Sequence, residues 1–167
     1  MVVNHEDIIS HIKDNVGDVL KVIPDDYGVL IAEVSVHQVY KLISFLFKDL
    51  NYKFNILVDL CGVHYPDRKG EELGVVYHIQ SMSLRTRIRL KVFVPIEKPE
   101  VPSLTGIYAA ANWMERETYD FYGILFLGHP NLVRILNMDE MIDFPMRKEF
   151  PLEDPKRRDK EDFHFGR

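Results

Sequence analysis

The segment E-R-E-T-Y-D, Glu115–Asp120, places three acids and one base among aromatic residues. Two carboxyl groups such as Glu117 and Asp120 can act as a general acid and a general base. No companion nucleophile, metal-ligand motif or phosphate-binding loop supports that chemistry in this sequence. Charges that flank aromatic residues more often orient a helix against a loop or a partner, where arginine and tyrosine are favoured contacts. We therefore interpret the segment as an interaction element.

On a helix, Arg116 and Asp120 are one turn apart and can form an ion pair. The remaining charges then point to different sides of the helix. The aromatic side chains lie between them: Trp113, Tyr119, Phe121 and Tyr122.

A second candidate for chemistry is Cys61 with His64, close to Asp59 at the end of an apolar run. A cysteine and a histidine can form a nucleophile and its base. A lone cysteine in an apolar strand is, however, usually an inert core residue. Because Cys61 is the only cysteine, the chain cannot form an internal disulfide or a four-cysteine iron–sulfur site by itself.

Other chemistry finds little support in the sequence. None of the seven histidines falls into a metal-ligand spacing such as H-E-x-x-H. No G-x-G-x-x-G, Walker or G-x-S-x-G motif is present. Tyr77, His78 and the basic strand beside them could suggest RNA stacking, but the formal net charge of −5 argues against it.

The composition is that of one globular domain: 167 residues, of which 46% are hydrophobic and 28% charged. No apolar run approaches the roughly 18 to 20 residues that span a bilayer. The N-terminus carries acids where a signal peptide needs a basic region. We expect the chain to stay in the cytoplasm or on the cytoplasmic face of a larger assembly.

The elements that must position these residues begin with a helix capped by Asn4 and closed by Gly17. Residues 19–23 and 28–34 are predicted to form two strands around a turn. Ser35, with Gln38 three residues on, predicts a capping box at the start of a second amphipathic helix that ends near Asp49.

Three further strands are predicted at residues 54–63, 73–82 and 85–94, the first of them central in the sheet and the other two a hairpin. The third alternates strictly, with apolar residues on one face and basic residues on the other: Arg85, Arg87, Arg89 and Lys91. That basic face is either solvated or faces a partner.

The proline-rich residues 95–102 are expected to break the sheet, and Ser103 to cap a third helix that ends at Gly123. Residues 129–167 show no sustained period, yet they are too apolar for a disordered tail. Such an arm either wraps its own domain or lies along another protein. The sequence thus predicts an α+β fold: a mostly antiparallel sheet with helices on one face, then a helix and an extended, irregular arm. We divide the chain into an α+β domain, 1–128, and the C-terminal arm, 129–167.

The block W-x-E-R-E-x-Y-D-x-Y-G-I-x-F-x-G-H-P-N-L, Trp113–Leu132, resembles the signature of the 30-kDa subunit family of bacterial respiratory complex I, NADH-quinone oxidoreductase, whose members are its C subunits. F-P-M-R-K-E-F-P-L at 144–152 is similar to the family's second block, and the segments 56–66 and 89–113 resemble the sequences upstream. One departure is Val133, where relatives often carry a second basic residue before Arg134.

The resemblance implies a non-catalytic subunit in the peripheral arm, on the cytoplasmic side of the cell membrane. Such subunits carry no cofactor; FMN, iron–sulfur clusters, NADH and quinone are handled by other subunits of a proton-translocating complex. The implied partners are the 49-kDa-like D subunit, whose surface helps to form the quinone site, and the cluster-bearing B and I subunits. No nucleic acid and no direct membrane span are implied.

The site residues that the resemblance points to fall into two groups. The first positions the third helix: Trp113, Glu115, Arg116, Glu117, Tyr119, Asp120 and Gly123. The second anchors the arm: His129, Pro130, Arg134, Arg147 and Lys148. Two alternatives stay open, namely the same role in a ferredoxin-fed or hydrogenase-type relative, and a stand-alone enzyme that uses Cys61 and His64.

Overall fold

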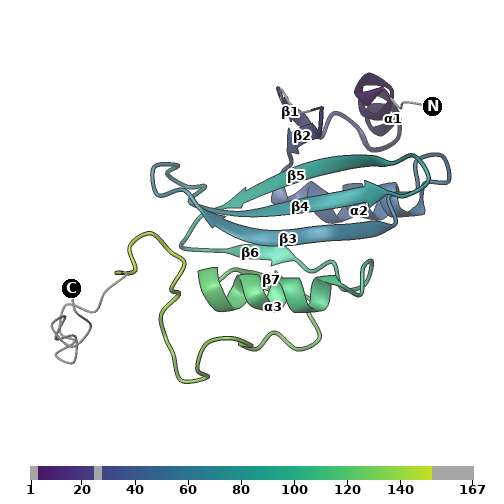
Figure 1. The fold of residues 1–167 in the computed structure, drawn as a ribbon. Coiled ribbons are helices and arrows are strands. Elements are labelled where there is room, and N and C mark those ends of the chain that lie inside the picture. The colour runs from purple at the N-terminus through teal and green to yellow at the C-terminus, as the bar shows by residue number, and fades with distance from the viewer. Residues whose placement is uncertain (1–3, 25–27, 152–167) are drawn as a thin grey trace, which may run out of the picture.

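The computed structural model describes residues 4–24 and 28–151. A five-stranded sheet with strand order β1-β2-β5-β4-β3 forms the body (Figure 1). Its strands are β1 (Lys21–Ile23), β2 (Leu30–Glu33), β3 (Ile56–His64), β4 (Leu73–Ser81) and β5 (Thr86–Val94). All neighbours pair antiparallel except β2 with β5. The predicted α+β class with a mostly antiparallel sheet is confirmed.

The helices are α1 (His5–Val16), α2 (Val36–Lys48) and α3 (Ala111–Tyr122). The Asn4 side chain accepts a hydrogen bond from the Glu6 amide, and the Gly17 amide donates to Lys13, so the predicted ends of α1 are confirmed. The predicted capping box of α2 is wrong. The Ser35 side chain makes no capping bond, because the Gln38 amide donates to the Ser35 carbonyl instead.

The core lies between one face of the sheet and helices α2 and α3. On β4 and β5 the alternate residues that face it are almost fully buried, among them Tyr77, Ile79, Ile88 and Leu90. Gly62 of β3 shares this face, since it pairs with Val75. A Cβ atom at Gly62 would run into the Tyr122 ring, so glycine is needed for α3 to lie this close to the sheet.

Two expectations about strands and helix bounds are wrong, and one short strand was not predicted; the main sheet does end at Val94, before the proline-rich segment. Strand β3 is at the edge of the sheet, not central; α3 runs beside it (Figure 1), and this neighbour explains the apolar run. The proline-rich segment contains β6 (Glu100–Pro102), which pairs parallel with β7 (Leu125–Leu127) in a second, two-stranded sheet. The third helix begins at Ala111, because the Ser103 hydroxyl binds Glu115 and does not cap a helix.

From Gly128 to Pro151 the described chain has no helix or strand and runs back along α3 (Figure 1). The rest of the predicted arm, 152–167, lies outside the described residues. No helix within the described ranges is long and apolar enough to cross a bilayer.

Candidate functional site

The buried carboxylate of Asp120 joins α3 to the arm. Its side chain is fully buried and accepts hydrogen bonds from three consecutive backbone amides, those of Ile135, Leu136 and Asn137, at 2.8–3.0 Å. The Asn137 amide group donates a further bond at 2.9 Å, and the Arg134 guanidinium forms an ion pair at 2.8 Å. One carboxylate thus fixes four consecutive residues of the arm.

The electrostatics of Asp120 follow from these donors. Burial alone would raise the pKa of the Asp120 carboxyl. The backbone amides of Leu136 and Asn137, the Asn137 side chain and the Arg134 guanidinium outweigh burial and hold that pKa far below its usual range. The predicted pairing of Arg116 with Asp120 is therefore wrong, because Arg134 takes that place.

The C-terminal end of α3 is closed by the arm as well. The carbonyls of the last helical turn have no partner inside the helix. Here the Asp120 carbonyl accepts a bond from Arg134, that of Phe121 from the Met146 amide, and that of Tyr122 from Arg147 Nε at 2.8 Å. Two arginines at this end also complement the negative pole of the helix dipole.

Gly123 makes this closure sterically feasible. Its φ of 74° and ψ of 25° are left-handed, as the predicted helix end requires. A Cβ atom there would collide with the Phe144 ring and the Arg147 guanidinium. Both Arg134 and Arg147 stack on Phe144, and Tyr119 meets the same ring edge-on.

The first half of α3 is tied to its own domain by a second buried carboxyl, that of Glu115. The Ser103 hydroxyl and the Leu104 amide donate to it at 2.7 and 2.6 Å. No cation lies within ion-pair distance of Glu115 in the described part of the chain. Burial therefore raises the pKa of Glu115 to about 7, although the hydrogen bonds from its two donors lower that pKa.

The other predicted positioning residues lie on the outer side of α3. Arg116 donates to the carbonyls of Val133 and Arg134 and stacks on Trp113, a residue that is 63% exposed. Glu117 is exposed.

Of the predicted arm residues, His129 is fixed in one tautomer, since Nε2 donates to the Asn112 carbonyl and Nδ1 accepts from the Asn131 amide. Pro130 is exposed. Arg134 and Arg147 use their donors within the chain. Lys148 differs, because its backbone amide binds His64 Nδ1 at 2.9 Å while its side chain is exposed.

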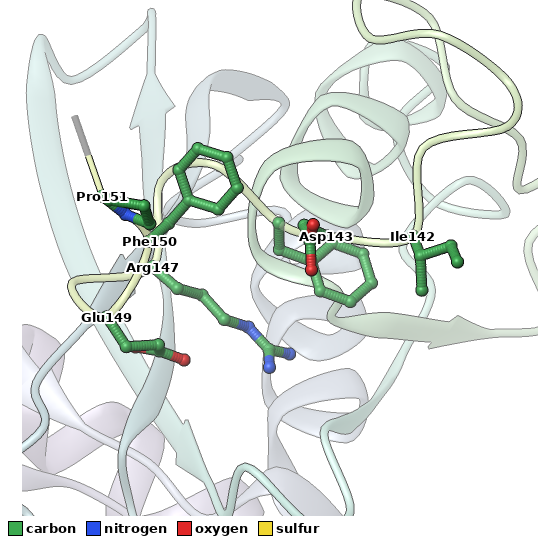
Figure 2. Close-up of a pocket in the computed structure, with 7 residues that line it drawn as sticks. Ile142, Asp143, Arg147, Glu149, Phe150 and Pro151 are labelled. Atoms are coloured by element: carbon green, nitrogen blue, oxygen red, sulfur yellow. The ribbon is translucent and has the colours of Figure 1, made fainter. Parts of the chain in front are cut away.

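The arm encloses a hollow of about 690 Å³ next to this junction. Figure 2 shows Phe150 and Pro151 on one side and Ile142 and Asp143 on the other, with Arg147 extending between them. Large apolar side chains stay exposed along the arm, with Ile142 87% and Met138 73% accessible; the others are Val133, Leu136 and Met146. Together with Trp113, we call these residues the apolar row.

The arrangement offers no support for the enzymatic interpretations. Cys61 and His64 are three residues apart on β3, so their side chains point to opposite faces of the sheet. Burial raises the pKa of the Cys61 thiol, and Asp59 and Glu117 add to that effect. Asp120 is enclosed by the arm and cannot reach a substrate. No cluster of three metal-ligating side chains occurs in residues 4–24 and 28–151.

Several residues that build the site have no motif of their own in the sequence. The amides of Ile135, Leu136 and Asn137 act through their backbone, which no side-chain pattern reveals. Ser103 was interpreted as a helix cap and is a hydrogen-bond donor to Glu115. The signal that could have found them is the block of charged residues on α3, because buried carboxylates need several donors.

Fold and site together define an α+β chain whose extended arm is fixed to its own last helix through a buried carboxylate. The chain belongs to the family of the 30-kDa subunit of respiratory-chain NADH dehydrogenase, whose model matches residues 32–156.

The relatives share much of the chain. The C subunit of the NADH-quinone oxidoreductase of Acidithiobacillus ferrooxidans is 40% identical over 88% of this chain and 75% of its own length. The C subunit of the Mycolicibacterium gilvum enzyme is 43% identical over 74% of this chain, which spans 54% of that relative. The same subunit of Azorhizobium caulinodans is 45% identical over 75% of this chain and 59% of its own length.

Solved structures also resemble this one, among them the following two. A trypsin-resistant fragment of Nqo5 matches with a TM-score of 0.62 and 27% identity, over 77% of this chain and 98% of the fragment. A chain of an archaeal membrane-bound sulfane sulfur reductase matches with a TM-score of 0.75 over 89% of this chain and 86% of that chain. Its identity is 24%, and it shows the fold alone.

Proposed function

We propose that this chain is a non-catalytic subunit of the peripheral arm of a proton-translocating NADH:quinone oxidoreductase. It secures the 49-kDa-like D subunit near the quinone site and lies close to the B and I subunits, on the cytoplasmic side of the membrane. Electrons pass from NADH through FMN and iron–sulfur clusters of other subunits to quinone. The observation that carries this proposal is the apolar row, which lies on an arm that hydrogen bonds hold against α3.

The apolar row supports docking for an energetic reason. Large exposed apolar side chains in one stretch mark an interaction site on a soluble protein. Covering them contributes roughly 25 cal/mol per Å² before ordering costs. Asp120, Arg134 and Arg147 already hold the described arm in place, so less conformational entropy is lost when a partner binds. The hollow in Figure 2 is large enough to take several side chains of a partner.

Under this proposal, the predicted anchor residues make different contacts. Arg134 and Arg147 fix the arm on α3, and the exposed side chain of Lys148 meets a partner carboxylate. The division into a domain, 1–128, and an arm, 129–167, is part of the proposal. The Nqo5 relative, solved as a trypsin-resistant fragment, supports a separable core.

A tagged full-length chain, purified from its own cells, tests the proposal. Mass spectrometry should identify the D, B and I subunits together with NADH-binding flavoprotein subunits. Substituting Leu136, Met138 and Ile142 with serine should reduce recovery of the 49-kDa-like subunit. Serine at Val22 and Leu50, which are exposed elsewhere, is the matched control. Equal recovery of the 49-kDa-like subunit with both variants would remove the arm from the interface.

The rival role is the same subunit function in a ferredoxin-fed or hydrogenase-type relative. The purification distinguishes the two, because nickel-ligand cysteines in the co-purified large subunit would identify the hydrogenase type. For this chain itself we propose no bound cofactor. Elemental analysis of the isolated chain should therefore find neither iron nor zinc in stoichiometric amount.

A further inference from the structure

The sheet face opposite α2 and α3 carries an unusual group of charges. In Figure 1, α2 lies behind β4 and β5, and no helix of the described residues crosses in front of them. Alternation along β5 places Arg87, Arg89 and Lys91 on this face, since Ile88, Leu90 and Val92 point into the core. We call these three residues the basic row. Successive members lie roughly 7 Å apart, two residues along a strand.

The basic row has no counter-charge within the described chain. Among the described residues, no carboxylate lies within ion-pair distance of its three members. On β2, Glu33 pairs with Lys91 in register. Its carboxylate is occupied by Lys21 at 2.8 Å and by Arg68 at 3.1 Å. Three unneutralised cations in a line are notable in a protein with a net charge of −5.

Two members are oriented by neutral acceptors on β4. Arg87 donates to the Gln80 side-chain oxygen at 3.0 Å, and Arg89 Nε donates to His78 Nε2 at 2.6 Å. His78 must be neutral to accept this bond, and burial, followed by the charge of Arg89, lowers its pKa accordingly. Asp59 Oδ2 lies 3.8 Å from His78 Nδ1 on the other side.

These bonds fix the guanidinium groups without neutralising them. Among the described residues, the terminal nitrogens of Arg89 and the ammonium of Lys91 have no side-chain partner, so they can bind outside acceptors. A solvated surface gains nothing from such orientation, whereas a binding surface does, because less side-chain entropy is lost on contact. Ile56 and Met82, both partly exposed, border the row at the end of Arg87 and Gln80.

We propose that the basic row docks an acidic, extended segment of a partner protein. Carboxylates on alternate residues of such a segment recur at the same spacing as the three cations, so each can meet one. The acidic net charge of this chain disfavours nucleic acid as the occupant. The proposal goes beyond the docking of the arm, because the basic row lies on the other face of the sheet.

A carbodiimide cross-link on the assembled complex tests the proposal directly, because it joins a lysine amine only to a carboxylate in contact. We expect mass spectrometry to find Lys91 joined to an Asp or Glu of another subunit. Lys91→Arg keeps the charge and should lose the cross-link while assembly persists. If the D and B subunits co-purify but Lys91 forms no cross-link and is acetylated as fast as in the isolated chain, this inference fails and the proposed function stands.

The isolated full-length chain gives a second test that does not depend on assembly. A synthetic peptide of alternating Glu and Thr should shift backbone NMR signals of β4 and β5. Arg87→Gln with Lys91→Gln should weaken binding by roughly tenfold or more, since two charge-assisted contacts are lost. Lys41→Gln with Lys48→Gln removes the same charge from α2 and should leave the affinity unchanged.

Three results would overturn the proposal in this second test. Equal weakening by the α2 control would show attraction by charge alone. No saturable shift on β4 and β5 would show that no site exists. Binding to phosphatidylglycerol vesicles that depends on Arg87 and Lys91, without binding of the peptide, would assign the row to a membrane surface.

Discussion

Glu115 and Asp120 are both fully buried on one helix, five residues apart, yet their surroundings are opposite. Within the described chain, Glu115 has two neutral donors and no cation, and burial raises its pKa to about 7. Asp120 has Arg134 and three consecutive amides, which hold its pKa far below the usual range. Burial decides the charge of a carboxyl only when donors are few. The first carboxyl is part of the domain, and the second fixes an arm.

The largest effect on stability is expected when the Asp120 carboxylate is removed. Asp120→Ala leaves Arg134 and the amides of Ile135, Leu136 and Asn137 without an acceptor. Removing one partner of a buried ion pair costs about 3–5 kcal/mol. Urea denaturation should show this loss in the free energy of unfolding, and trypsin should cut the arm faster. Glu117→Ala, on the exposed side of the same helix, is the control and should change little.

The pH dependence of stability should separate the two carboxyls. Glu115 has a folded pKa of about 7 against an ordinary value of 4.5, so the folded state holds its proton more tightly. The contribution of Glu115 to the free energy of unfolding is complete below its unfolded pKa. It is lost as the pH rises to its folded pKa, and the loss is about 3 kcal/mol at most. Asp120 has the opposite sign: its contribution is present above its unfolded pKa and is lost as pH falls through the folded one.

Thermal melts across pH measure both effects. Glu115→Gln should abolish the decline between about pH 4 and pH 8 and leave the acid limb unchanged. An unchanged decline in that variant would mean that another group titrates there.

A smaller effect is expected at the end of α3. Gly123→Ala places a side chain on a left-handed residue and drives it into Phe144 and Arg147, at a cost of about 2 kcal/mol or more. Gly128→Ala provides the matched control, because its φ is 85° but no atom lies within 4 Å of a Cβ there. The difference between the two free energies of unfolding isolates the collision with the arm. Equal losses of stability in the two variants would show that the arm moves away from the new side chain without a cost in free energy.

Some features of the fold and of this site could be predicted from the sequence, and others could not. Periodicity predicted α1, α2 and the β4–β5 hairpin, and capping residues predicted the ends of α1, since these features depend on neighbours in sequence. The edge position of β3 and the short β6 could not be predicted, because α3 and β7 come from distant segments. The charged block on α3 pointed to a contact element. Its partners are backbone amides of the arm, so the choice of Arg134 over Arg116 emerges only in three dimensions.

The smallest expected effect concerns Cys61, the remaining residue near α3 that could do chemistry. Its thiol is half-buried on β3, and burial, Asp59 and Glu117 all raise its pKa, so little thiolate forms at neutral pH. His64 points to the other face and accepts a bond from the Lys148 amide. Cys61→Ala should therefore cost on the order of 1 to 2 kcal/mol in stability. Turnover of the assembled complex should stay nearly intact. A turnover loss of roughly a thousandfold with normal assembly, equivalent to about 4 kcal/mol in the barrier, would show that a catalytic group lies beside α3.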